Sequence, residues 1–138
     1  MTPQEMSRIH GLAFVHERGW SAAEFEQMLA QPYIQHFSTV GGFALTRSLA
    51  GESELLTLAV APEHQRRGIA RSLLKRWLKN SSPLADTAFL EVAADNITAL
   101  ALYDSLLFQR SNTRKAYYTR KGGKAVDAIL MSRDLTQG

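Results

Sequence analysis

Apolar positions near the start of the chain recur at helical spacing, behind two sequences typical of helix starts. Residues 2–5 (Thr-Pro-Gln-Glu) and 21–24 (Ser-Ala-Ala-Glu) both read as capping boxes. We therefore expect one helix to start at Pro3 and a second to start after Ser21 and stop before Pro32. The aromatic-flanked segment 14–20 would connect them.

Short apolar runs then predict a series of strands. Residues 34–40 and 43–49 would form a hairpin that turns at Gly41-Gly42. The continuous apolar runs 55–61 and 87–93 are typical of strands buried on both faces. Residues 110–119 and 125–133 flank a Gly122-Gly123 turn and predict a last pair of strands.

Two further helices separate these strands. Residues 67–79 carry an inner apolar stripe, and Asn96 would cap a helix that ends near residue 106. The order is helix, helix, strands, helix, strand, helix, strands, which predicts one mixed α/β domain over residues 1–138.

Composition narrows the class of protein. A chain of 138 residues suits a single domain, and 45% hydrophobic with 21% charged residues is close to the globular average. The absence of cysteine excludes disulfides and a thiol nucleophile. No run approaches the roughly 18 apolar residues of a membrane span, and the start does not resemble a signal peptide, so we expect a cytoplasmic protein.

Charge is spread unevenly along the chain. Residues 1–61 have a net charge of −3, residues 62–104 of +1 and residues 105–138 of +5. The basic final third suggests either nucleic-acid binding or a solvated strand pair, and we favour the strand pair because its aromatic residues show no spaced stacking pattern.

Residues 58–70 form the most informative stretch, in which an apolar strand ends and two arginines and a glycine open a helix. Unpaired backbone N–H groups at a helix start can bind anionic oxygens. Gly68 would allow close approach of a ligand, with Arg66 and Arg67 beside it. This pattern indicates a pyrophosphate cradle without the ending of a nucleotide P-loop; the alternative is an arginine-rich helix start without a ligand.

Two other residues carry candidate chemistry. Glu91 interrupts an apolar strand, so it is either a general base at a wet cleft or a buried partner of an arginine from a neighbouring strand. Tyr103 shares a helical stripe with Asn96 and Ala99 and is either functional or a core aromatic. The four histidines (residues 10, 16, 36 and 64) lack metal-site spacing, and we expect them at the surface or at edges, with no metal bound.

These features together resemble the GCN5-related N-acetyltransferases (GNAT). Their pyrophosphate loop follows a Gln/Arg-x-x-Gly-x-Gly/Ala pattern, which residues 65–70 match as Gln-Arg-Arg-Gly-Ile-Ala. Within that superfamily the chain looks most like the bacterial ribosomal-protein-alanine N-acetyltransferases, through Leu90-Glu91-Val92, Asn96, the segment 101–103, Tyr117-Tyr118 and the segment 127–131.

The resemblance implies a mixed, mostly antiparallel central sheet flanked by about four helices, with the family's first strand missing or truncated. It also implies acetyl-CoA as cosubstrate. The implied contacts to acetyl-CoA are Leu58, Ala59, Val60, Gln65, Arg66, Arg67, Gly68, Ile69, Ala70 and Asn96. Glu91 would be the proton acceptor and Tyr103 the proton donor, while Phe14, Trp20 and Tyr118 would contact the acceptor amine.

The implied reaction moves acetyl directly to a primary amine, most specifically the N-terminal alanine of a ribosomal protein. A protein lysine, a small-molecule amine and a non-catalytic acyl-CoA-binding module are the alternatives. Two positions depart from the family's pattern: five residues separate Phe14 from Trp20, and Leu107 stands where the family's helix usually ends in glycine. A left-handed Leu107 would predict that Leu107→Gly is neutral or stabilising.

Overall fold

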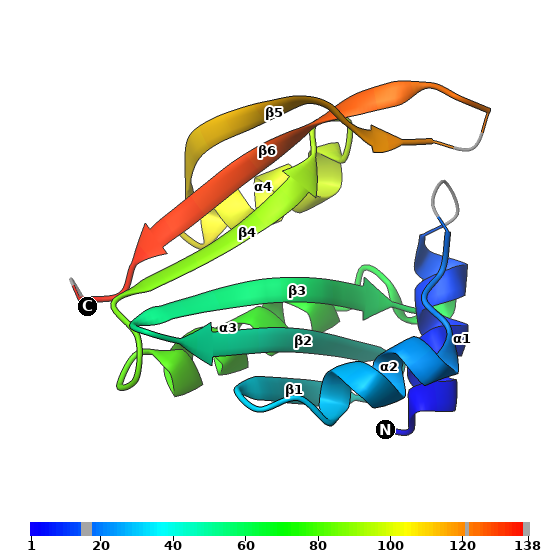
Figure 1. Cartoon of the computed structure of the whole chain (residues 1–138), viewed down its shortest axis with the longest axis horizontal. Helices are drawn as coiled ribbons and strands as arrows, with labels where there is room; N and C mark the ends of the chain where they lie inside the picture. The colour runs from blue at the N-terminus through cyan, green and yellow to red at the C-terminus, as the bar shows by residue number, and fades with distance from the viewer. Residues whose placement is uncertain (15–17, 121, 137–138) are drawn as a thin grey trace.

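The computed structural model describes residues 1–14, 18–120 and 122–136. Its elements follow the expected α/β order, as Figure 1 shows. In chain order they are α1 (Pro3–Ala13), α2 (Ala22–Leu29), β1 (Ile34–Thr39), β2 (Gly42–Leu49), β3 (Glu52–Val60), a 3-10 turn (Pro62–His64), α3 (Ile69–Ser81), β4 (Thr87–Ala93), α4 (Ile97–Ser105), β5 (Gln109–Thr119) and β6 (Ala125–Asp134).

The helix starts are fixed by the side chains that the sequence predicted. Ser21 Oγ accepts from the Glu24 N–H, and the Glu24 carboxylate accepts from the Ser21 N–H, which completes a capping box. Thr2 Oγ1 accepts from the Glu5 N–H at 3.1 Å, but the Glu5 carboxylate binds Arg8 instead, so only half of the first box forms.

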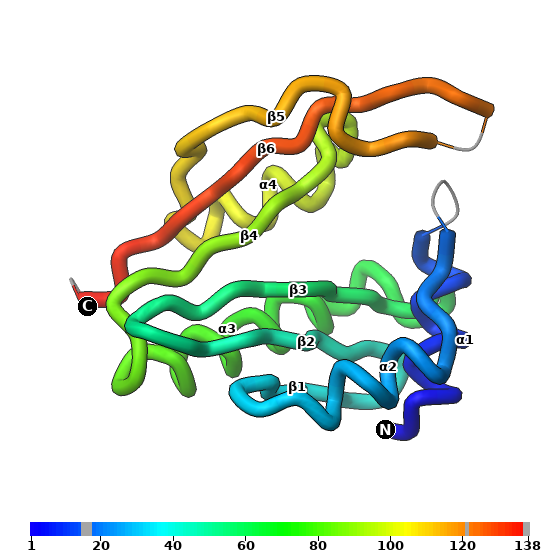
Figure 2. Tube along the Cα trace, in the orientation of Figure 1, coloured from blue at the N-terminus to red at the C-terminus, as the bar shows by residue number. Residues whose placement is uncertain are grey.

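The strands form one mixed sheet in the order β1-β2-β3-β4-β6-β5. The β3–β4 pair is parallel and the other neighbours are antiparallel, which confirms the expected mostly antiparallel sheet. Only Glu52–Glu54 of β3 pair with β4, opposite residues 87–89. Beyond these residues the two strands diverge, as the traces in Figures 1 and 2 show.

Helices cover both faces of this sheet. Phe43 and Leu45 of β2 pack with α1 and α2, in a cluster that includes the fully buried Met6, Ile9 and Phe25. Ala44, between them, belongs to the cluster on the other face, which holds side chains of α3 and α4 such as Trp77 and Leu100. The alternation along β2 therefore separates the two helix pairs onto opposite faces.

Several predicted boundaries are wrong for local reasons. The strand expected at 55–61 begins at Glu52, because Ala50 and Gly51, with φ of 54° and 82°, form a tight turn directly from β2. The first hairpin turns at residues 40–41, and Gly42 already lies in β2. The third helix starts at Ile69 and not at residue 67, since Gly68 is its left-handed N-cap.

Burial also differs from the expectation for the two apolar runs. Buried and half-buried positions alternate along β3 and β4, so neither strand is fully covered on both faces. Strand β5 lies at the sheet edge and is exposed along almost its whole length, but β6 lies inside the sheet and buries Val126, Ala128 and Met131, so the expected solvated pair holds only for β5. In the part of the chain that the structure describes, no helix has the length and apolarity to cross a bilayer.

Candidate active site

The divergence of β3 and β4 leaves backbone groups of β3 without a strand partner on one side. The Ala61 N–H donates to the Gly41 carbonyl at 2.8 Å, so Ala61 faces β2. Backbone groups of successive residues point to alternate sides of a strand, and those of Val60 and Leu58 therefore face away from β2. The Leu58 N–H is directed toward the side on which β4 has separated.

The loop after β3 is shaped by two left-handed residues. Arg66 has a φ of 64° and Gly68 a φ of 78°. The Gln65 side-chain amide donates to the Val60 carbonyl at 3.0 Å and ties the loop to the strand end. A Cβ at position 68 would meet no atom within 4 Å, so the backbone angle, and not space, favours glycine here.

This loop presents free amides at the start of α3. Gly68 caps the helix without a side chain, and the first helical bond runs from the Ser72 N–H to the Gly68 carbonyl. The N–H groups of Ile69, Ala70 and Arg71 thus lack intrahelical partners. With the exposed Arg66 and Arg67 beside them, they fit the phosphate groups of acetyl-CoA.

A basic groove continues from this loop along the outer face of α3. Its volume is about 380 Å³, and Gly68, Arg71, Ser72, Lys75, Arg76 and Lys79 line it. Helix α3 contains no acidic residue. The groove therefore extends the positively charged surface that begins at the loop.

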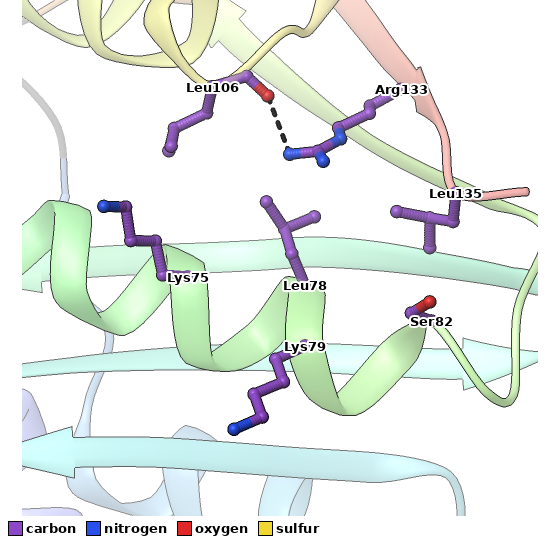
Figure 3. A pocket seen from close by; sticks show the side chains of 7 residues that line it. All are labelled: Lys75, Leu78, Lys79, Ser82, Leu106, Arg133 and Leu135. Carbon is purple, nitrogen blue, oxygen red and sulfur yellow. Dashed lines mark hydrogen bonds between the residues drawn. The ribbon is translucent and has the colours of Figure 1, made fainter. Parts of the chain in front are cut away.

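A second cavity, of about 360 Å³, lies toward the C-terminal end of α3 and shares Lys75 and Lys79 with the groove (Figure 3). Lys75, Leu78 and Lys79 of α3 and its C-cap residue Ser82 line the cavity, opposite Leu106, Arg133 and Leu135. The Arg133 guanidinium donates to the Leu106 carbonyl at 3.0 Å across its upper rim. Two of the lining residues, Arg133 and Leu135, flank Asp134, which lies opposite Thr87 at the start of β4. Thr87 also pairs with Glu52, so the cavity lies near the paired end of β3 and β4. Glu91 lies further along β4, beyond the paired residues.

Glu91 lies on β4 beyond the last residue that pairs with β3. Its neighbours Leu90 and Val92 are buried in the cluster that contains Tyr103, so the Glu91 side chain projects from the opposite face of the strand. It is 23% exposed, and its Oε1 lies 3.3 Å from Nη2 of Arg114 on β5. The structure therefore contains the arginine partner that one interpretation of the sequence required, but at a partly exposed site.

Tyr103 is almost fully buried on α4 and packs edge-on against Phe108. Burial raises the pKa of Tyr103 above its ordinary value, and the nearby Tyr118 adds to the rise. Its hydroxyl consequently stays protonated at neutral pH. Asn96, the other expected residue of this helix, caps α4 by accepting from the Ala99 N–H at 3.2 Å.

Phe14 and Trp20 flank a residue that the sequence interpretation misplaced. His10 is 4% exposed and stacks on both rings, with centroid distances of 4.4 Å to Phe14 and 5.1 Å to Trp20. Its Nδ1 accepts from the Trp20 N–H at 3.2 Å, and burial lowers its pKa to about 4. The expectation of a surface position was wrong for His10; its helical spacing from Met6 and Phe14 was the available signal. His36 is exposed and His64 half-buried, while His16 lies outside the described residues.

Tyr118 reaches the site through an irregularity of β5. The β5–β6 register shifts between Arg114 and Tyr118, where Ala116 has a φ of 50°. Asp127 of β6 holds this bulge, since its carboxylate accepts from the Ala116 N–H at 2.8 Å. Tyr118 is half-buried and packs edge-on against Tyr117 at 5.2 Å. The bulge lies directly before Tyr118, and the electrostatic effect of Tyr118 on Tyr103 indicates that the two phenols are near each other.

One fold combines an open strand edge, a helix start with free amides and a carboxylate beyond the point where the strands diverge. The family is shown by the match of the sequence to a family model. Residues 10–107 match the model of the acetyltransferase (GNAT) family, and the chain belongs to this family. It is an acetyl-CoA-dependent N-acetyltransferase.

Two named enzymes and one crystal structure are similar to this chain over most of its length. The N-alpha-acetyltransferase RimI of Mycobacterium tuberculosis is 36% identical over 95% of this chain and 85% of its own. The [ribosomal protein bS18]-alanine N-acetyltransferase of Escherichia coli strain K12 is 34% identical over 85% of this chain and 82% of its own. A crystal structure of the ribosomal-protein-S18-alanine N-acetyltransferase from Escherichia coli superposes with a TM-score of 0.86, at 31% identity over 96% of this chain and 87% of that one.

Proposed function

We propose that this enzyme acetylates the N-terminal α-amino group of a protein that begins with alanine, most specifically a ribosomal protein. The observation that carries the proposal is the identity of 34–36% to enzymes named for N-terminal acetylation, spread over 85–95% of the chain. The net charge of −3 over residues 1–61, which include Phe14 and Trp20, also suits a cationic protein as acceptor.

In the proposed reaction, the chain holds acetyl-CoA by its phosphates and by its thioester end. The amides of Ile69 and Ala70, with Arg66 and Arg67, would bind the pyrophosphate. The backbone of residues 58–60 would bind the pantetheine arm, and the Leu58 N–H would stabilise the negative charge that develops on the carbonyl oxygen.

Glu91 would act as the general base. An α-amino group has an ordinary pKa near 8, so most acceptor molecules arrive as ammonium at neutral pH. Glu91 projects at the strand divergence with 23% of its side chain exposed, which leaves the carboxylate accessible to an amine or to a bridging water. Removal of the proton frees the nitrogen lone pair to attack the thioester carbon.

Tyr103 would act as the general acid. The departing thiolate has an ordinary pKa near 8.5, and a protonated phenol beside it would supply the proton. The raised pKa of Tyr103 keeps the phenol protonated but lies further above that of a thiol, so its burial opposes the proton transfer and the role rests on the position of the hydroxyl. The alternative interpretation of Tyr103, as a core aromatic residue, is compatible with this role, because the ring can be buried while the hydroxyl alone reaches the thiolate.

Variants at these two residues test the proposal with an assay of free thiol release. Tyr103→Phe should lower kcat by about 10²–10⁴-fold with little change in acetyl-CoA affinity. Glu91→Gln should flatten the rise of the rate with pH. A Tyr103→Phe turnover within twofold of wild type, or an unchanged pH profile for Glu91→Gln, would refute the assigned role.

The acceptor is tested with a matched set of amines. An alanine-starting peptide, the same peptide with an acetylated N-terminus and an internal lysine, and a polyamine are each offered with acetyl-CoA, and the products are identified by mass spectrometry. We expect acetylation of the first peptide alone. Preferred acetylation of the lysine or of the polyamine would contradict the proposed substrate while leaving the transferase activity intact.

A further inference from the structure

Arg114 on β5 and Glu91 on β4 form an ion pair across the intervening strand β6. Strand β6 lies between β4 and β5, with Leu130 opposite Glu91 and Ala128 opposite Arg114. Leu130 and Ala128 are two residues apart, so all these side chains share one face of the sheet. The small side chain of Ala128 leaves room for Arg114 to lie over β6 and reach the carboxylate.

The ion pair between them is weak in every respect that the structure shows. It consists of one N–O contact at 3.3 Å, between side chains that are 49% and 23% exposed. The guanidinium also lies over the ring of Tyr117, 5.2 Å from its centroid, and Tyr117 is itself exposed. Arg114 can therefore leave Glu91 and keep its contact with the aromatic ring.

We propose that the Arg114 guanidinium occupies the position of the acceptor's ammonium group in the free enzyme. Arg114 neutralises Glu91 there, and the incoming amine displaces Arg114. This inference rests on the proposed function, in which Glu91 receives the amine. The acetylated product is a neutral amide and no longer competes for the carboxylate. Arg114 then returns to Glu91 and favours product release, so the residue acts through Glu91 and not on the reacting atoms.

Displacement makes a specific prediction about affinity. Removing the competing cation in Arg114→Gln should lower both the acceptor KM and the acceptor Kd by about two- to fivefold, the size of a partly exposed ion pair. The acetyl-CoA KM should not change. Arg114→Lys keeps a cation within reach and should restore wild-type values.

Arg110 provides the matched control. It lies on the same strand, its side chain is 57% exposed, and its ion pair is with Asp104 at 3.9 Å. Arg110→Gln removes the same charge from the same strand without touching Glu91. Its acceptor affinity should therefore stay at the wild-type value, which separates a local competition from a general change in surface potential.

The deciding experiment is calorimetric titration of an alanine-starting peptide into each variant saturated with CoA, beside steady-state kinetics with acetyl-CoA. In a Glu91→Gln background, Arg114→Gln should have no effect on peptide affinity. Weaker or unchanged peptide binding by Arg114→Gln, or a gain that persists without Glu91, would overturn the inference. Peptide that binds without being acetylated by the wild type would contradict the proposed function alone, while peptide that binds to none of the variants would overturn both.

Discussion

Leu107 is held in a backbone conformation that an L-residue adopts at a cost, and its replacement by glycine should stabilise the enzyme. Its φ is 70°, directly after the C-cap of α4. The Phe108 N–H donates to the Tyr103 carbonyl and the Leu107 N–H to the Asp104 carbonyl, at 3.1 and 3.0 Å. This is the Schellman pattern, in which the left-handed position favours glycine.

The magnitude follows from opposing contributions. The Cβ in the left-handed region costs about 1–2 kcal/mol, and the extra freedom of glycine in the unfolded chain offsets about 0.5–1 kcal/mol of the gain. The Leu107 side chain is 70% exposed, so its removal loses little packing. We expect a net stabilisation of about 0.5–1 kcal/mol, which corresponds to a rise in Tm of roughly 2–4 °C for a domain of this size.

The control is Leu107→Ala, which truncates the side chain but keeps the Cβ. Its Tm should equal that of the wild type or fall slightly below it, since the backbone strain remains. Both variants are compared by calorimetry and by urea denaturation, where an unchanged m-value shows that the unfolded state is comparable. A Leu107→Gly protein no more stable than Leu107→Ala would show that position 107 is not strained.

Two further substitutions test other features of the fold. Burial favours neutral His10 in the folded state, so the unfolded chain binds more protons between pH 6.5 and about 4. The contribution of neutral His10 to the free energy of unfolding is fully present above pH 6.5 and is lost as the pH falls through that window, by up to about 3 kcal/mol. In a pH series of urea denaturations, His10→Gln should flatten the fall in stability over this range. A variant whose stability falls with pH in parallel with the wild type would contradict the burial of a neutral His10. Ala50, with a φ of 54° before Gly51, should gain about 0.5–1 kcal/mol as Asn, the residue that this turn type favours. Gly51→Ala is the opposite control and should lower the Tm, and a less stable Ala50→Asn protein would argue against the turn.

Local signals predicted those parts of the fold that depend on neighbouring residues. The capping box at Ser21 and the cap at Asn96 each rest on contacts within a few residues, and each is present. The left-handed conformation of Leu107 was raised only as a condition, from the glycine that is usual at this position in the family, and the structure has it. The turn at Ala50 was missed although it is equally local. Alanine is rare at a positive φ, so the sequence held no turn signal before Gly51.

Contacts between distant segments could not be predicted in the same way. The burial of His10 depends on Trp20 and Phe25, which come from the following loop and helix. The sequence suggested that an arginine could pair with Glu91 but not which one. The partner is two strands away in the sheet, because β5 lies outside β6 and a bulge sets its register.

The parallel β3–β4 pair explains why residues far apart in sequence form one candidate site. Their carboxyl ends lie at the same end of the sheet, so the loop after β3 and the start of α4 after β4 lie on the two sides of the gap between the strands. Because pairing stops at Glu54, both strands keep free backbone groups at that edge, and α3 begins there with its own free amides. If the two strands were paired to their ends, those backbone groups would bond to each other and would not be available to a ligand, although the Glu91 side chain would still project from the same face of the sheet. The divergence of the two strands is therefore the feature of the fold on which the proposed chemistry depends.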